Sequence, residues 1–556
     1  MFKKSIRTMS FILISMVLIS GVSFAGQWAK TYGGSGNDDG SIVPKGDGTF
    51  DLDGTTDSFG AGKLDGLKAK LTATGAVSWA RTFGGKRDDD LSAMDLPDGG
   101  FFVSGMSKSF GTGNPAAPNN NIVFAKFDSA WEPVFQHVIG GAREETGYFI
   151  STKDKGFLFL GQSNSYGPSA GDQDILLMKI KSDGVPAWKK AFHVGSTDQL
   201  TDVKEQNNGF LVAATVVQLK FQALDRTTRP ERSLSHILLM KLDKATGDVI
   251  WKELLGSPEG SLLSAELFKA ADGNYFLTGM FITSPLPAIS SQIPSISSPI
   301  PFFEILLLKF NPETGAVLLS STYGSGSPTV VPLADNLKIN PDGTIVLTGN
   351  TLTVDYSDLS ETSKVLVMKL KADLSITWQK NLNGKDGIYA FISDTGLLNG
   401  YAGSSTDTAP ADVLYAKLNP TTYEPVWART FGAAGDEWGD LTKMGKKYLL
   451  SGGTESFGGA TIYKANIFGI VLDANGNYPN CNVKPFNMTV EDSYLTESSI
   501  QILPKIFTLA ERFPEAPTDI SLTITSPKLQ AKNICPAIAA PADTLEKLEE
   551  VPLVLK

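Results

Sequence analysis

The sequence predicts an all-β protein, an eight-bladed β-propeller of four-stranded blades. Three observations support this prediction. A segment such as Trp79-Ala-Arg-Thr-Phe-Gly-Gly85 recurs along the 556-residue chain, at intervals of roughly 50–70 residues, which is the spacing of a repeat protein. Short apolar runs bounded by Gly, Asp and Asn follow each recurrence, as expected for strands. Four such runs per repeat are typical of propeller blades.

Each repeat begins with an anchor residue, which is usually tryptophan. Trp131 is not an anchor, because Trp131-Glu-Pro-Val-Phe135 aligns with Tyr423-Glu-Pro-Val-Trp427. We interpret the anchors as wedges that are buried between neighbouring blades. The eight anchor positions are Trp28, Trp79, Phe135, Trp188, Trp251, Leu319, Trp378 and Trp427.

The most regular run of the repeat, for example 174–180 (Asp-Ile-Leu-Leu-Met-Lys-Ile), carries a lysine in seven of the eight units, and Val471 takes its place in the eighth. We interpret this lysine as a side chain that covers apolar surface and meets a carboxylate at the blade edge. A central ring of lysines that binds an anion is the alternative. The seven lysines are Lys70, Lys126, Lys179, Lys241, Lys309, Lys369 and Lys417.

The two ends of the repeat region predict how the ring closes. The chain starts with an anchor strand alone, and the last repeat ends with the run 466–472. Together these two halves should complete one blade. Seven blades is the runner-up, because the unit around Ile388 to Gly403 is the least regular, and a linear β-solenoid is the competing arrangement.

The N-terminal residues have the pattern of a secretory signal peptide. Lys3, Lys4 and Arg7 precede the apolar run 11–19, and Ser23-Phe24-Ala25 provides a small-residue cleavage site. We therefore expect an exported protein, which is secreted, on the cell surface or periplasmic, without stable membrane insertion. The expected organisation is a signal peptide (1–25), a propeller (26–477), a cysteine-bracketed Thr/Ser-rich β segment (478–536), and a linker with a short tail (537–556).

The charge balance and the cysteines indicate further which class of protein this is. The chain has 59 acidic and 49 basic residues, so it lacks the basic footprint of a nucleic-acid-binding protein. Its only two cysteines, Cys481 and Cys535, bracket the C-terminal segment. In an exported chain this pair predicts a disulfide.

The repeat resembles the SBBP-type bacterial β-propeller repeats over about residues 27–477. The resemblance rests on Trp-Ala-Arg-Thr-Phe-Gly-Gly, on the Asp-Ile-Leu-Leu-Met-Lys run, and on Ser-Phe-Gly at 58–60, 109–111 and 456–458. It implies a secreted or cell-surface bacterial propeller. It implies no reaction, because this family has no shared catalytic motif to transfer.

The acidic turns after the anchors are the candidate metal ligands. Clustered carboxylates in Gly-rich turns suit Ca²⁺, but the turns lack the ligand spacing of a dedicated calcium loop, and Asp and Asn also favour turns for backbone reasons. We expect turn chemistry, with a Ca²⁺ site as the alternative and no other cofactor. The candidates are Asp38, Asp39, Asp88, Asp89, Asp436 and Glu437.

The expected function is non-catalytic binding of an extracellular protein or polysaccharide at the loop-bearing face, where insertions 220–236 and 283–303 lie. We assign no catalytic residue. The alternative is a propeller enzyme, either glycan-active or similar to the quinone-dependent alcohol dehydrogenases, that uses the central funnel. Those dehydrogenases pair adjacent cysteines over their cofactor, and this sequence has no adjacent pair.

Overall fold

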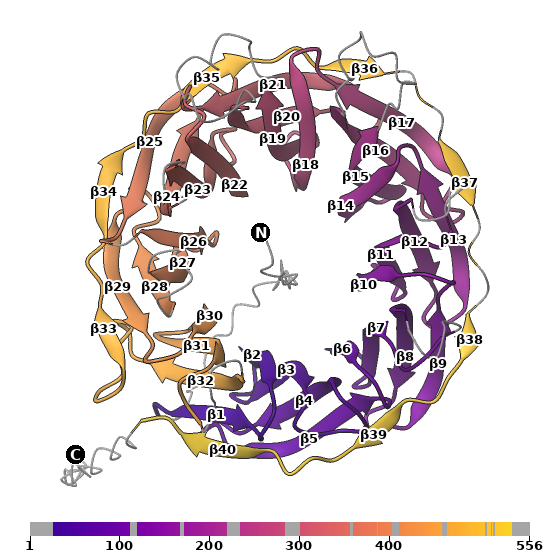
Figure 1. Cartoon of the computed structure of the whole chain (residues 1–556), viewed down its shortest axis with the longest axis vertical. Helices are drawn as coiled ribbons and strands as arrows, with labels where there is room; N and C mark the ends of the chain where they lie inside the picture. Colours follow the sequence, from indigo (N-terminus) through magenta and orange to yellow (C-terminus); the bar gives the residue numbers. More distant parts are fainter. Residues whose placement is uncertain are drawn as a thin grey trace, which may run out of the picture.

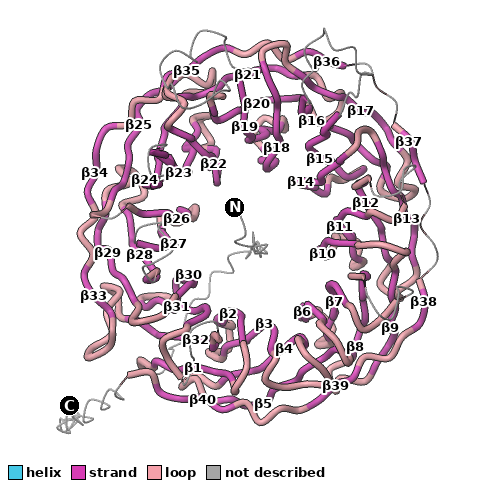
Figure 2. Tube along the Cα trace, in the orientation of Figure 1, coloured by secondary structure: helices cyan, strands magenta, loops and turns pink. Residues whose placement is uncertain are grey.

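The computed structural model describes residues 26–111, 119–166, 172–218, 234–283, 301–355, 360–385, 387–402, 411–458, 464–505, 507, 509–512, 514 and 517–535. These residues form strands and loops and contain no helix (Figure 2). Their strands make eight sheets around a central opening (Figure 1). The predicted eight-bladed propeller is confirmed. The expectations for residues 1–25 and 537–556 lie outside the described residues.

Each blade has four antiparallel strands, the first at the central opening and the fourth towards the rim (Figure 1). From inside outwards, blade 1 has β2 (Asp38–Pro44), β3 (Phe50–Thr56), β4 (Asp65–Leu71) and β5 (Val77–Gly84); blade 2 has β6 (Asp89–Asp95), β7 (Phe101–Ser107), β8 (Asn121–Phe127) and β9 (Pro133–Ile139); blade 3 has β10 (Glu145–Ser151), β11 (Phe157–Ser163), β12 (Asp174–Ile180) and β13 (Pro186–His193); blade 4 has β14 (Thr197–Glu205), β15 (Gly209–Gln218), β16 (Leu234–Asp243) and β17 (Val249–Gly256).

The remaining blades follow the same order. Blade 5 has β18 (Gly260–Lys269), β19 (Tyr275–Thr283), β20 (Phe303–Phe310) and β21 (Val317–Gly324); blade 6 has β22 (Val330–Ile339), β23 (Ile345–Asp355), β24 (Ser360–Leu370) and β25 (Ile376–Asn383); blade 7 has β26 (Ile388–Ile392), β27 (Leu397–Ala402), β28 (Asp412–Leu418) and β29 (Pro425–Phe431); blade 8 has β30 (Glu437–Met444), β31 (Lys447–Thr454), β32 (Asn466–Leu472) and β1 (Ala29–Gly33).

Blade 8 closes the ring. Its fourth strand is β1, which pairs antiparallel with β32, so that Ala29 lies opposite Ile470 and Tyr32 opposite Ile467. The predicted closure between the two ends of the repeat region is confirmed. Blade 7, the unit with the least regular sequence, is complete, although β26 and β27 have only five and six residues.

The hydrophobic core lies between the blades. The second and third strands of a blade are apolar on both faces because each face packs against a neighbouring blade. All seven residues of β12 are buried. Leu160 and Leu177 of blade 3, for example, share one cluster with Phe210 and Leu238 of blade 4.

The C-terminal segment adds a fifth strand to every blade. We call residues 483–533 the belt. It runs around the rim against the direction of the propeller chain (Figure 1). Its strands are β33 (Val483–Pro485) on blade 7, β34 (Thr489–Asp492) on blade 6, β35 (Thr496–Ser499) on blade 5, β36 (Leu503–Lys505) on blade 4, β37 (Ala510–Arg512) on blade 3, β38 (Thr518–Asp519) on blade 2, β39 (Thr523–Thr525) on blade 1 and β40 (Gln530–Asn533) on blade 8.

Apolar belt residues between these short strands seal the spaces between the blades. Each is buried and joins a core cluster between two blades, so the belt covers otherwise exposed strand edges and also extends the core. These residues are Met488, Leu495, Ile500, Leu522 and Leu529.

The disulfide joins the two ends of the belt. Cys481 lies two residues before β33 on blade 7, and Cys535 lies two residues after β40 on the adjacent blade 8. Their Cα atoms are 5.2 Å apart. The predicted disulfide is confirmed, and it closes a covalent hoop around the propeller. Whether this segment contacts the propeller was open from the sequence; in the structure it contacts every blade.

Candidate functional site

The acidic turns connect one blade to the next. Five buried carboxylates, which we call the junction acids, begin the innermost strands of their blades. The backbone N–H of each donates to the carbonyl of the residue before the third strand of the preceding blade, as from Asp89 to Leu64 (2.7 Å). The junction acids are Asp38, Asp89, Glu145, Asp198 and Glu437.

Asp89 shows how a junction acid is satisfied. Its Oδ2 accepts the N–H of Gly85 (2.6 Å) and the hydroxyl of Ser109 (2.7 Å), and its Oδ1 accepts the hydroxyl of Ser107 (2.5 Å). The acid therefore ties the Gly-Gly turn to the Ser-Phe-Gly loop, which explains why these motifs recur together. The donors range from two backbone N–H groups at Asp198 to four at Asp89, and such local hydrogen bonds match the turn interpretation.

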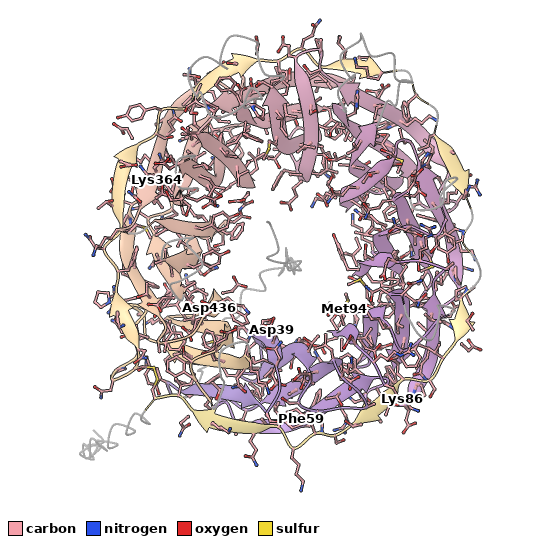
Figure 3. The ribbon with its side chains drawn as sticks, viewed as in Figure 1. Asp39, Phe59, Lys86, Met94, Lys364 and Asp436 are labelled. Atoms are coloured by element: carbon pink, nitrogen blue, oxygen red, sulfur yellow. A yellow bond between two sulfur atoms is a disulfide. The ribbon has the colours of Figure 1, made fainter. Side chains whose placement is uncertain are left out.

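The other metal candidates are more exposed and serve different contacts. Asp39 accepts the indole N–H of Trp438 from blade 8 (2.9 Å), and Asp436 accepts the N–H of Ala411 (2.9 Å). Asp88 lies 3.7 Å from the ammonium group of Lys108. Asp39 and Asp436 lie towards the central opening (Figure 3). Ca²⁺ binding at these turns stays a prediction.

The anchors are not all buried as predicted, because only Trp28, Trp188 and Trp427 are buried and the other five are half-buried. The indole N–H of Trp188 in blade 3 donates to the carbonyl of Lys244 in blade 4 (3.1 Å). Its ring lies so close to Gly247, which has a φ of +71°, that a Cβ there would come within 2.6 Å. The equivalent turn residue also has a positive φ in blades 2, 6 and 7, where it is not glycine but Trp131, Leu374 and Tyr423, respectively.

The recurrent lysine belongs to the third strand of its blade and lies opposite the anchor of the fourth strand, as in the pairs Lys179–Trp188 and Lys241–Trp251. Its ammonium group meets a carboxylate at a turn, for example Asp154 at 3.1 Å from Lys179. These lysines therefore form no central ring. For the lysines with such an ion pair, the prediction that the side chain meets a carboxylate at the blade edge is confirmed. The other such pairs are Lys70–Asp47, Lys126–Asp98, Lys241–Glu313 and Lys309–Asp272.

The loop-bearing face carries the connections from second to third strands and the crossovers between blades. The strands that flank both insertions reach this face, since the insertions join β15 to β16 and β19 to β20 in adjacent blades 4 and 5. Most of each insertion, 220–233 and 284–300, lies outside the described residues, while Leu234, Ser235 and His236 belong to β16. Two polar cavities open among these connections. One of about 650 Å³ is lined by Asp57, Lys63, Asp88 and Lys464. The other, of about 490 Å³, is lined by Lys86, Arg87 and Lys108 together with Ser521 and Thr523 of the belt. Lys86 lies towards the rim (Figure 3).

An aromatic platform lies on the two innermost strands of blade 7. Tyr389 of β26 pairs with Tyr401 of β27 across the strands. Their rings stack with centroids 5.7 Å apart, and Phe391 meets Tyr389 edge-on at 5.6 Å. Tyr401 is 43% exposed, and the pair lies at the end of the strands nearest the loop-bearing face. An exposed, preformed stack of rings is a surface for a ligand with flat apolar faces.

Asp335 lies beside this platform. It is the extra residue of a β-bulge in β22, because Ala334 and Asn336 pair with consecutive residues of β23. Burial raises the pKa of Asp335 to about 7. The hydrogen bond that the Asn350 amide donates to it (2.5 Å) lowers the pKa but only partly offsets this rise. Asn350, which donates to Asp335, also donates to the carbonyl of Ala390 in β26 and accepts its N–H, both at 3.1 Å, so the carboxyl group is linked to the strand that carries Tyr389. Burial and the charge of Asp335 raise the pKa of both tyrosines.

Sequence reasoning missed this site. The alternation Ile-Tyr-Ala-Phe-Ile over 388–392 was a signal, because its aromatic residues fall on the face opposite the buried Ile388, Ala390 and Ile392. The bulge at Asp335 had no comparable signal.

No family model matches the chain, and neither does any curated protein. Among solved structures it is similar to the polysaccharide lyase Uly1, with a TM-score of 0.39 and 12% identity over 82% of this chain and 91% of that one. It is also similar to the Dos1 propeller, with a TM-score of 0.37 and 8% identity over 83% and 98%. At these identities the similarity concerns the fold alone and carries no argument about activity. In the described residues no helix is long and apolar enough to cross a membrane.

Proposed function

We propose that this protein is an exported, non-catalytic binding module whose ligand is an extracellular polysaccharide. The observation that supports the proposal is the aromatic platform of Tyr389, Phe391 and Tyr401 on the inner wall of blade 7. Sugar rings present flat C–H faces edged by hydroxyls, so they suit stacked aromatic rings flanked by polar groups. A protein ligand at the same face is the competing partner.

Polar cavities at blades 8, 1 and 2 of the same face also suit a polar ligand. The two cavities of the loop-bearing face are lined largely by charged side chains and Gly turns, and the second carries three cationic residues. These residues suit hydroxyl and carboxylate groups rather than an apolar molecule. The eight-bladed ring holds all of these groups on strands or short connections, which limits the ordering cost of binding.

Binding to a panel of immobilised polysaccharides tests the proposal. The double substitution Y389A/Y401A should weaken binding about tenfold or more, because exposed tyrosines at the centre of an interface are typical binding hot spots. The matched control is Tyr494→Ala, since Tyr494 is 80% exposed on the belt and far from the inner wall. Equal binding by the platform variant and the wild type would refute the platform, and binding to proteins alone would favour the competing partner.

The same assay tests the insertion at 283–303. Its base is closed, because the N–H of Thr283 donates to the carbonyl of Phe302 and the N–H of Phe302 donates to the Thr283 hydroxyl, both at 3.0 Å. Deleting 284–300 should therefore leave the thermal unfolding midpoint unchanged. Weaker binding by this deletion would add the insertion to the contact surface, and unchanged affinity would remove it.

A glycan-active enzyme is the second candidate, and Asp335 is the observation that favours it. A carboxyl group with a pKa near 7 beside an aromatic platform has the protonation state of a general acid at neutral pH. If the protein cleaves a polysaccharide that it binds, reducing ends should appear with the wild type and not with Asp335→Asn. If the wild type releases no reducing ends, the enzyme candidate is rejected and the binding module is retained.

A further inference from the structure

The third blade departs from the repeat at one position of its fourth strand. Five residues after the anchor, six of the eight units carry glycine, namely Gly33, Gly84, Gly140, Gly256, Gly324 and Gly432. At these glycines an added Cβ would meet a side chain from the first three residues of the third strand, for example Asp65 at 1.9 Å from Gly84. In blade 3 the same position holds His193. An imidazole therefore occupies a place that the repeat usually keeps empty.

His193 lies between two buried carboxylates from neighbouring blades. Asp174 begins the third strand of blade 3, and Asp198 is the junction acid of blade 4; both are fully buried. The N–H of Asp198 donates to the carbonyl of Gln173 (2.7 Å), which holds the two acids side by side. The His193 Nδ1 lies 2.7 Å from Asp174 Oδ1 and 3.9 Å from Asp198 Oδ2. One ligand atom from each of the three residues falls within 4.8 Å of the others.

One oxygen at this junction is unused. Within the described residues, Asp174 Oδ2 is buried and has no hydrogen-bond partner. The contact with His193 Nδ1 accounts for Asp174 Oδ1 but leaves Oδ2 without a partner, and the 3.9 Å between His193 Nδ1 and Asp198 Oδ2 is too long for a hydrogen bond. Nearby Asp172 adds negative charge, and Arg512 of the belt offsets part of it. A buried, unpaired carboxylate oxygen is costly.

We propose that Asp174, His193 and Asp198 bind a divalent transition-metal ion of the Zn²⁺ class. Two carboxylates neutralise the charge of such an ion, and one imidazole with two carboxylates is a ligand set that Zn²⁺ accepts, whereas Ca²⁺ and Mg²⁺ prefer oxygen ligands alone. The His193 side chain is 22% exposed, so the site can be reached from solvent. The site ties blade 3 to blade 4, and it is independent of the proposed polysaccharide binding.

Two other junctions serve as internal comparisons. Asp65 with Asp89, and Asp412 with Glu437, also bring two acids around the corresponding glycine, Gly84 or Gly432. They lack the imidazole, so the proposal predicts no tight Zn²⁺ binding there.

Equilibrium dialysis of the EDTA-stripped, oxidised protein against ZnCl₂ tests the proposal. The wild type should retain one Zn²⁺ per chain and, with CoCl₂, should show the visible absorption bands of low-symmetry Co²⁺. His193→Gly, which restores the residue of the repeat, and Asp174→Asn should each weaken Zn²⁺ binding more than about 100-fold, since even outer partners of metal ligands contribute 10- to 100-fold.

The matched control is His137→Gln, because His137 of blade 2 is equally exposed but contacts a single carboxylate, that of Asp519 (2.9 Å). It should bind Zn²⁺ as the wild type does. Thermal unfolding without metal checks that each variant folds. The proposal is overturned if the wild type retains no Zn²⁺, if His193→Gly folds and binds Zn²⁺ normally, or if His137→Gln loses binding to the same extent.

Discussion

Replacing both cysteines with alanine (C481A/C535A) is expected to lower the free energy of unfolding by about 4 kcal/mol. The disulfide closes a loop with a sequence separation of 54 residues, and the chain-entropy model gives about 4 kcal/mol for a loop of that length. Chemical denaturation of the variant and the wild type, both followed by tryptophan fluorescence, measures the difference.

The structure also predicts where this loss acts. The belt strands have two to four residues each, and strands this short are marginal on their own. Without the disulfide the belt should detach from its two ends, at blades 7 and 8, and expose the core there. Reduction of the wild type is the control and should reproduce the effect of the substitutions. A difference below about 0.5 kcal/mol, which is typical of neutral surface changes, would contradict the account.

Replacing the anchor Trp188 with alanine is expected to lower the free energy of unfolding by about 3–5 kcal/mol, the usual range for removing a large aromatic side chain from a core. Trp188 is buried between blades 3 and 4, where its ring packs against Phe210 with centroids 6.1 Å apart. The substitution would also leave the carbonyl of Lys244 without its indole donor. Chemical denaturation measures the loss.

The matched control is Ile250→Ala. Ile250 precedes an anchor in the equivalent strand of blade 4, but it is 51% exposed. Its substitution should change stability by less than about 0.5 kcal/mol. Similar losses for both substitutions would show that the anchors are not wedges between blades.

The blades could be predicted from the sequence because each carries the same local pattern. The anchors, the Asp-Gly turns and the apolar third strand recur with their spacing intact, so repetition compensates for weak signals in single units such as blade 7. Closure followed from counting half-units at the two ends, and the disulfide followed from the only two cysteines.

The position of the belt could not be predicted in this way. Its strands are short, rich in Thr and Ser and without a repeat, because their register is set by the free edges of the fourth strands and not by a pattern of their own. The single buried residues such as Leu495 and Leu522 lie between strands, where periodicity gives no signal.

The candidate sites depended on contacts between blades. The proximity of Asp335 to Tyr389 and Tyr401 requires a bulge in blade 6 and a strand pair in blade 7. His193 lies near the acidic turn of Asp198, yet its partner Asp174 comes from the apolar run that looked purely structural. Such pairs, distant or inconspicuous in the sequence, become visible only once the ring is assembled.

Hydrogen–deuterium exchange of the oxidised protein tests the central structural claim most directly. If the belt pairs with all eight blades, amides of 483–485, 489–492, 496–499 and 530–533, which form antiparallel pairs with β29, β25, β21 and β1, should exchange much more slowly than an unfolded chain. Reduction of the disulfide should speed exchange first at β33 and β40. Exchange throughout 483–533 at the rate of an unfolded segment, with the blade strands still protected, would contradict the belt.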